Sequence, residues 1–174
     1  MWKILYIICV ILQFLPNLAF VTFTNLKCIN SDKNFCEFSK CNIKAVNRTH
    51  KYLELHAVIH QVPVNNITIR LKTMHFNNGY KPFFIDVTFD ACNFLKNPKN
   101  IFVKAFYDVF KKTSNMNHTC PYNHDLIVDK LYTGNLETDL LGIIPAASGR
   151  YAVYMDFSVL DTPRASVNTY FTLS

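Results

Sequence analysis

Residues 83–90 read FFIDVTFD, and apolar side chains occupy every second position of this stretch. Successive side chains of an extended chain point to opposite faces, so the alternation predicts a β-strand with one buried face. The buried face carries Phe83, Ile85, Val87 and Phe89, and the other face carries Asp86, Thr88 and Asp90.

The same alternation recurs on both sides of this stretch. Further strands are predicted over residues 51–60, 66–74, 150–160 and 165–173, with shorter ones over 20–28, 41–47 and 124–132. The sequence NNGY at 77–80 predicts a turn, since Asn and Gly tolerate positive φ. Strands and turns at this spacing predict an all-β fold, an antiparallel β-sandwich.

Residues 100–112, NIFVKAFYDVFKK, follow a helical period instead. Their apolar positions are Ile101, Phe102, Ala105, Phe106, Val109 and Phe110. This spacing predicts an amphipathic helix with Asn100 as its N-cap. DACNFLKN at 90–97 predicts a short helical turn that stops before Pro98. The sandwich is therefore expected to carry one helical insertion, over about 91–112.

The amino terminus has the plan of a secretory signal peptide over residues 1–19, with cleavage near Ala19. Its apolar run, from Ile4 to Leu15, is shorter than the roughly 20 residues of a membrane span, which is the alternative. No later stretch is long and apolar enough to cross a bilayer. We therefore expect a secreted, extracellular protein with a single domain over residues 20–174.

Secretion also bears on the cysteines and on glycosylation. Removing Cys9 with the signal peptide leaves five of the six cysteines: Cys28, Cys36, Cys41, Cys92 and Cys120. Disulfides are the default for secreted cysteines, and an odd number leaves one over. Three sequons predict solvent-exposed glycosylation sites at Asn47, Asn66 and Asn117.

The stretch NHTCPYNHD, residues 117–125, brings His118, Cys120 and His124 close together. Their spacing is irregular and lacks the paired ligands of structural zinc sites, so no metal site is expected. Basic residues are scattered rather than clustered, which does not favour nucleic-acid binding. The interpretation we prefer for this stretch is a disulfide-anchored loop with a sugar at its rim.

Candidate catalytic groups have no supporting context. The nucleophile elbow G-x-S-x-G is missing from the sequence, and no motif pairs Cys36 with a histidine. Asp86 and Asp90 alternate on a predicted exposed face, which is typical of a solvated strand rather than a glycosidase pair. We expect a protein that is not an enzyme, with no catalytic residue and no cofactor.

Aromatic residues are frequent, with Phe at 15 of 174 positions, and many fall on predicted inward faces. They either fill the core or hold the two sheets apart, which would leave an apolar cavity with the helix over its mouth. The pattern of residues leaves both arrangements open.

Five segments are FTNLKC at 23–28, CNIKAVNRT at 41–49, NGYKPFFIDVTFDAC at 78–92, FLKNP at 94–98 and NHTCPYNHDLIV at 117–128. Together they resemble a family of small secreted insect proteins assigned to a domain of unknown function and expanded in flies. The resemblance runs from about Phe23 to Ser174. That family is similar in turn to the ML-like lipid-recognition superfamily of immunoglobulin-like sandwiches, which includes the lysosomal sterol carrier and the ganglioside activator. Some related insect proteins are implicated in contact chemosensation.

The resemblance implies two disulfides, Cys28–Cys41 and Cys92–Cys120, the second worth about 3 kcal/mol through loop closure. Cys36 falls where the family pattern implies an apolar residue. Its thiol is expected to be buried and inert or to pair between chains. Cys36 also competes with Cys41 as the disulfide partner of Cys28. No catalytic residue is implied.

We therefore expect a secreted immunoglobulin-like sandwich that binds a small apolar ligand between its sheets, either a lipid or a hydrocarbon-like chemosensory cue. The alternative is an interaction protein with a filled core that contacts a receptor or another extracellular protein. Neither the ligand nor the oligomeric state follows from the sequence. The predicted lining consists of Leu55, Ile59, Ile69, Leu71, Phe83, Ile85, Val87, Phe102, Phe106, Val153, Met155 and Phe157.

Overall fold

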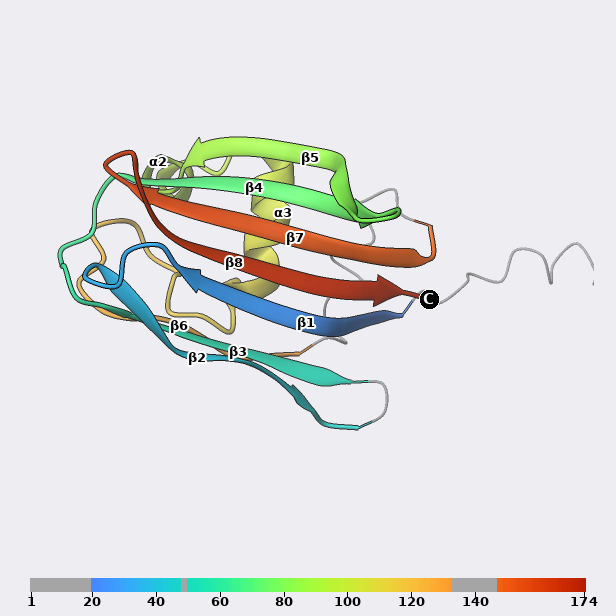
Figure 1. Ribbon diagram of the computed structural model, residues 1–174. Helices are drawn as coiled ribbons and strands as arrows, with labels where there is room; N and C mark the ends of the chain where they lie inside the picture. Colours follow the sequence, from blue (N-terminus) through green and yellow to red (C-terminus); the bar gives the residue numbers. More distant parts are fainter. Residues whose placement is uncertain (1–19, 48–49, 133–146) are drawn as a thin grey trace, which may run out of the picture.

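The computed structural model describes residues 20–47, 50–132 and 147–174, which form two packed antiparallel sheets (Figure 1). The expected signal peptide, residues 1–19, lies outside the described residues. The larger sheet has the order β1 (Val21–Asn30), β8 (Thr162–Leu173), β7 (Gly149–Val159), β4 (Ile67–Phe76) and β5 (Tyr80–Asp90). The smaller sheet has the order β2 (Cys36–Ala45), β3 (Lys51–Ile59) and β6 (Leu126–Tyr132). The prediction of an all-β antiparallel sandwich is confirmed.

The core lies between the sheets, where the predicted alternation places it. Leu71 of β4, Ile85 of β5 and Val153 of β7 are 2%, 5% and 7% exposed and belong to one hydrophobic cluster. Leu53 and Leu55 of β3 face them from the smaller sheet. The period-two pattern therefore identified the buried face of each of these strands.

The predicted turn joins β4 to β5. Asn78 and Gly79 have φ of 51° and 123°, and Phe76 pairs with Tyr80 across the turn. Asn and Gly adopt this left-handed region at low cost, which explains why the hairpin closes here.

The expected insertion forms two helices, α2 (Ala91–Lys96) and α3 (Ile101–Lys111), between β5 and β6. Asn100 is the N-cap of α3, and its side chain accepts hydrogen bonds from the amides of Phe102 and Val103, both at 3.1 Å. Val103 and Phe106 are the buried residues of α3, which runs between the two sheets (Figure 1).

Two disulfides tie these elements together. Cys28–Cys41 joins β1 to β2, and so links the larger sheet to the smaller one. Cys92–Cys120 joins α2 to the segment that precedes β6. Cys36 is a free cysteine and is buried, so it does not take the place of Cys41. Among the described residues, no helix has both the length and the apolar character to cross a membrane.

Candidate ligand-binding site

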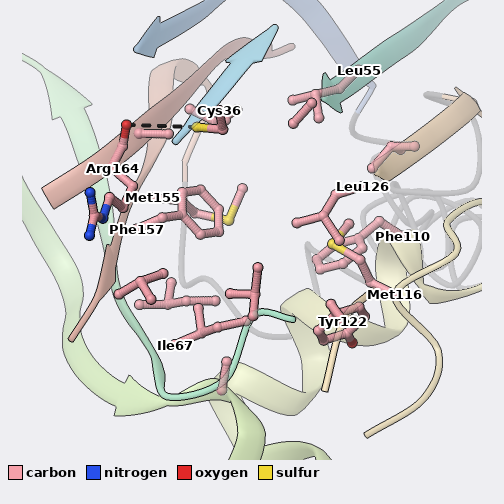
Figure 2. Close-up of a pocket in the computed structure, with 18 of the residues that line it drawn as sticks. Cys36, Leu55, Ile67, Phe110, Met116, Tyr122, Leu126, Met155, Phe157 and Arg164 are labelled. Atoms are coloured by element: carbon pink, nitrogen blue, oxygen red, sulfur yellow. Dashed lines mark hydrogen bonds between the residues drawn. The ribbon is translucent and has the colours of Figure 1, made fainter. Parts of the chain in front are cut away.

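A cavity of about 200 Å³ lies between the two sheets (Figure 2). The larger sheet contributes apolar side chains from β4, β7 and β8, and the smaller sheet contributes them from β2, β3 and β6. Helices α2 and α3 close one side with aromatic side chains, Phe94, Phe106 and Phe110 among them. Of the two arrangements left open by the sequence, the structure has the sheets apart with space between them.

Small side chains at the wall explain part of this space. Ala57 of β3, Ala91 of α2 and Ala165 of β8 all line the cavity and are 7% exposed. Each offers only a methyl group where a larger apolar residue would reach further into the sandwich. Aromatic residues of α3 line the same cavity, and the alanine positions leave space beside them.

The hydroxyls of the two tyrosines that line the cavity already have backbone partners. The hydroxyl of Tyr107 donates to the carbonyl of Met116 at 3.0 Å, and the hydroxyl of Tyr122 donates to the carbonyl of His118 at 2.8 Å. Burial raises the pKa of Tyr122 to about 12, so this hydroxyl remains a donor at physiological pH. These two tyrosines therefore bring aromatic rings to the wall but no free hydrogen-bonding group.

Cys36 also lines the cavity (Figure 2). Its sulfur donates weakly to the carbonyl oxygen of Arg164 at 3.8 Å. Burial raises the pKa of the Cys36 thiol, and the carboxylate of Asp32 raises it further, against a smaller opposite effect of Arg164. The reactive thiolate is disfavoured, and the side chain acts as a small apolar group.

Seven of the predicted lining residues border this cavity: Leu55, Ile59, Ile69, Leu71, Phe106, Met155 and Phe157. Val153 borders a second, smaller cavity of about 80 Å³ instead. Phe83, Ile85, Val87 and Phe102 border neither.

The position along the strands explains the difference. The cavity lies beside Ile67 and Phe89, at the end of the β4–β5 hairpin remote from its turn. Phe83 lies nearer the turn and packs against Tyr151, with ring centroids 5.7 Å apart. Phe102 packs edge-to-face against Phe84 at the sheet edge, with ring centroids 5.6 Å apart.

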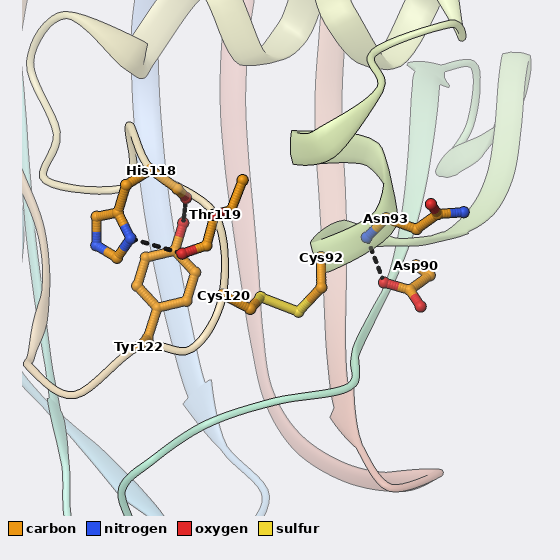
Figure 3. The surroundings of a disulfide bond; sticks show 7 residues. All are labelled: Asp90, Cys92, Asn93, His118, Thr119, Cys120 and Tyr122. Atoms are coloured by element: carbon orange, nitrogen blue, oxygen red, sulfur yellow. Dashed lines mark hydrogen bonds between the residues drawn. A yellow bond between two sulfur atoms is a disulfide. The ribbon is translucent and has the colours of Figure 1, made fainter.

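Sequence reasoning missed the part of the wall that comes from the segment 113–125. Tyr122 forms an isolated bridge with Val64, with backbone hydrogen bonds of 2.8 and 3.0 Å, and both residues line the cavity. The disulfide Cys92–Cys120 holds this segment against α2 (Figure 3). No periodicity marks such a bridge, because its two partners lie in irregular segments far apart in the chain.

The carboxylates weighed as catalytic candidates make structural contacts. Asp86 forms a bidentate ion pair with Arg70, with distances of 2.8 and 2.7 Å, and these hydrogen bonds lower the pKa of Asp86. Asp90 caps α2 by accepting from the amide of Asn93 at 2.9 Å (Figure 3). Within the described ranges, no group of three or more His, Cys, Asp or Glu is arranged to hold a metal ion.

The asparagines of the three sequons, Asn47, Asn66 and Asn117, are all exposed. Their exposure satisfies the physical requirement for a glycan at each position.

A family model described as "Protein of unknown function (DUF1091)" matches residues 65–153 of the chain. The match begins just before β4 and ends within β7, so it includes both helices and the Cys92–Cys120 disulfide. No curated protein matches the chain.

Proposed function

We infer that this chain, which belongs to the DUF1091 family of proteins of unknown function, binds a small apolar ligand between its two sheets without catalysing a reaction. The observation that carries the proposal is the cavity of about 200 Å³, whose wall is built from apolar side chains of both sheets and both helices. A well-formed apolar cavity is the default binding-site hypothesis for a protein of unknown function.

The volume suits a small hydrocarbon. An engineered apolar cavity of about 150 Å³ takes up benzene, with six carbons, so 200 Å³ corresponds to about eight carbons by simple scaling. A short alkyl chain, or one end of a longer lipid, matches this size. A complete sterol is larger than the space available.

The expected affinity follows from the same size. Burying about eight methylene groups contributes about 6 kcal/mol before the cost of association. That figure corresponds to a dissociation constant of about 40 μM at the tightest, and the cost of association moves it towards millimolar. Tyr107 and Tyr122 direct their hydroxyls to backbone carbonyls, so neither tyrosine offers a free hydrogen-bonding group to a polar headgroup.

Secretion and lipid recognition belong to the same proposal. The two disulfides, the exposed sequon asparagines and the predicted signal peptide all support an extracellular glycoprotein. The resemblance to the ML-like lipid-recognition superfamily supports a ligand between the sheets, as an analogy at the level of fold. The proposed ligand includes hydrocarbon-like contact cues, because a hydrocarbon has the apolar chemistry of this cavity wall.

A second candidate function has a separate observation in its favour. Phe84 on β5 and Ile101 at the start of α3 are 54% and 70% exposed, and Phe102 packs between these elements against Phe84. Ile101 is the chain neighbour of Phe102, and contiguous exposed apolar residues often mark a contact with another protein. The alternative role is that of a secreted protein whose surface contacts a receptor.

The decisive experiment is native mass spectrometry of the glycosylated protein secreted from insect cells, followed by solvent extraction of whatever co-purifies. A stoichiometric apolar adduct is expected, or uptake of one molecule from an added panel of short alkanes, alcohols and fatty acids. If the protein carries no adduct and takes up no molecule from the panel, the proposal is rejected. The surface around Phe84 then becomes the candidate site.

A matched pair of substitutions places the ligand. Phe157→Asp puts a carboxylate into the cavity wall and should abolish the adduct. Phe102→Asp changes a residue of the same type that borders neither cavity, so the adduct should survive. Near-ultraviolet circular dichroism checks that both variants are folded.

A further inference from the structure

Four aromatic rings form a continuous row in the wall of the main cavity. The ring of Phe94 packs against that of Phe89 and against that of Tyr107, with centroids 5.6 and 5.7 Å apart. Tyr107 in turn packs against Phe110, with centroids 5.6 Å apart. The interplanar angles of 66°, 87° and 88° make each contact edge-to-face. All four residues line the cavity of about 200 Å³.

The row is held in place by its surroundings. Phe89 lies on β5, Phe94 on α2, and Tyr107 on α3 with Phe110. The hydroxyl of Tyr107 donates to a backbone carbonyl at 3.0 Å, which restrains this ring. The Cys92–Cys120 disulfide anchors the short helix α2 that carries Phe94. Rings that are already ordered lose little conformational freedom when a ligand binds against them.

Resting on the proposed function above, we propose that this cavity selects an aromatic or conjugated hydrocarbon over a saturated one with the same number of carbons. An aromatic ring has a negative face and a positive edge, so an aromatic ligand extends the edge-to-face row. A saturated ligand has neither, and it gains only from the apolar area that it buries. One such ring pair strengthens binding about 2- to 12-fold beyond the effect of area.

Two thioethers favour the same class of ligand. Met116 and Met155 both line the cavity, and Figure 2 shows them reaching into it from opposite sides. A methionine sulfur interacts favourably with an aromatic ring, and this contact has no counterpart with a saturated hydrocarbon. A planar ring between the two sides therefore meets aromatic side chains and sulfur at once.

Headspace partitioning with the full secreted protein tests the preference in two pairs of ligands. The pairs are toluene with methylcyclohexane and ethylbenzene with ethylcyclohexane. Each affinity is expressed relative to partitioning into hexadecane, which removes the difference in hydrophobicity between the two members. The aromatic member of each pair should bind at least about threefold more tightly. The seven-carbon pair leaves room in a cavity for about eight carbons, so a preference there does not come from size.

A matched pair of substitutions separates the row of rings from the volume. Phe94→Leu removes the ring that contacts two others, together with three carbons, and should lower the preference at least about twofold in both pairs. Leu126→Ala removes three carbons from another lining residue that has no ring, so the ratio of affinities should stay unchanged. Phe110→Leu, at the half-buried end of the row, is the second ring variant. Cooperative urea unfolding checks that each variant is folded.

The outcomes distinguish this inference from the proposed function. Equal relative affinities within both pairs, a preference confined to the eight-carbon pair, or an equal loss of preference in Leu126→Ala would overturn the inference. The cavity would then bind hydrocarbons by size alone, and the proposed function would stand. If none of the four hydrocarbons binds, the proposed function and this inference are both rejected.

Discussion

Ala57→Ile tests whether the space between the sheets is empty in the protein. Ala57 lies on β3, is 7% exposed and borders the cavity of about 200 Å³. Isoleucine adds three carbons at this position, and its branched side chain suits a strand. The added group is expected to enter the cavity rather than displace a neighbour.

The expected gain in the free energy of unfolding follows from the cavity volume that isoleucine fills. Three carbons occupy about 75 Å³ when six occupy about 150 Å³. At about 24 cal/mol per Å³ of cavity removed, the gain is about 1.8 kcal/mol, reduced to about 1 kcal/mol by lost side-chain entropy. The melting temperature should rise by about 2–4 °C. Because three fewer methylene groups then fit, n-octane should bind about 50-fold more weakly.

Two assays read these effects on the same samples: thermal unfolding followed by circular dichroism, and headspace partitioning of n-octane. Ala152→Ile is the matched control, since Ala152 of β7 is 0% exposed and does not border the cavity. This control should lose about 1–3 kcal/mol through overpacking. If Ala57→Ile is destabilised as much as the control, the space is already filled and the reasoning is refuted.

Three further outcomes are expected. The amide of Ile59 and then the ring of His56 lower the pKa of Asp125, so this carboxylate stabilises the fold above its unfolded pKa of about 3.9. That stabilisation is lost as the pH falls through the lower pKa of the folded protein. In urea titrations below about pH 4, the free energy of unfolding should therefore fall less steeply with pH for Asp125→Asn than for wild type. The buried Cys36 thiol should react with a chromogenic disulfide reagent only after denaturation, and fast reaction in the native protein would contradict its placement. Asn100→Ala should cost about 1 kcal/mol in urea unfolding because α3 loses its cap, whereas an unchanged midpoint would show that the cap contributes nothing.

Local geometry explains what was predictable from the sequence. Alternation with period two identified the inward faces that hold Leu71 and Ile85, since neighbouring strand residues must point to opposite sides. The helical period and Asn100 placed α3 within a residue of its observed start. The disulfide pairing was a different case, because it came from family resemblance and not from the spacing of cysteines.

The boundary of the cavity depended on contacts that no local pattern records. Phe102 and Phe157 were equal candidates for its lining, yet only Phe157 borders it, because Phe102 packs on Phe84 of the edge strand β5. Whether an inward side chain meets another side chain or empty space depends on residues from the opposite sheet and the helices.

The contact between His118 and His124 likewise depends on tertiary structure rather than on a local sequence pattern. The sequence placed these residues near each other but with a spacing that predicts no site. The Cys92–Cys120 disulfide and the ring of Tyr122 hold the backbone between them so that the two Nε2 atoms meet. Periodicity thus determined the strands, the helix and their buried faces, because these depend on near neighbours in the chain. The cavity and the histidine pair were decided only in three dimensions, because their parts are brought together by long-range packing and a cross-link.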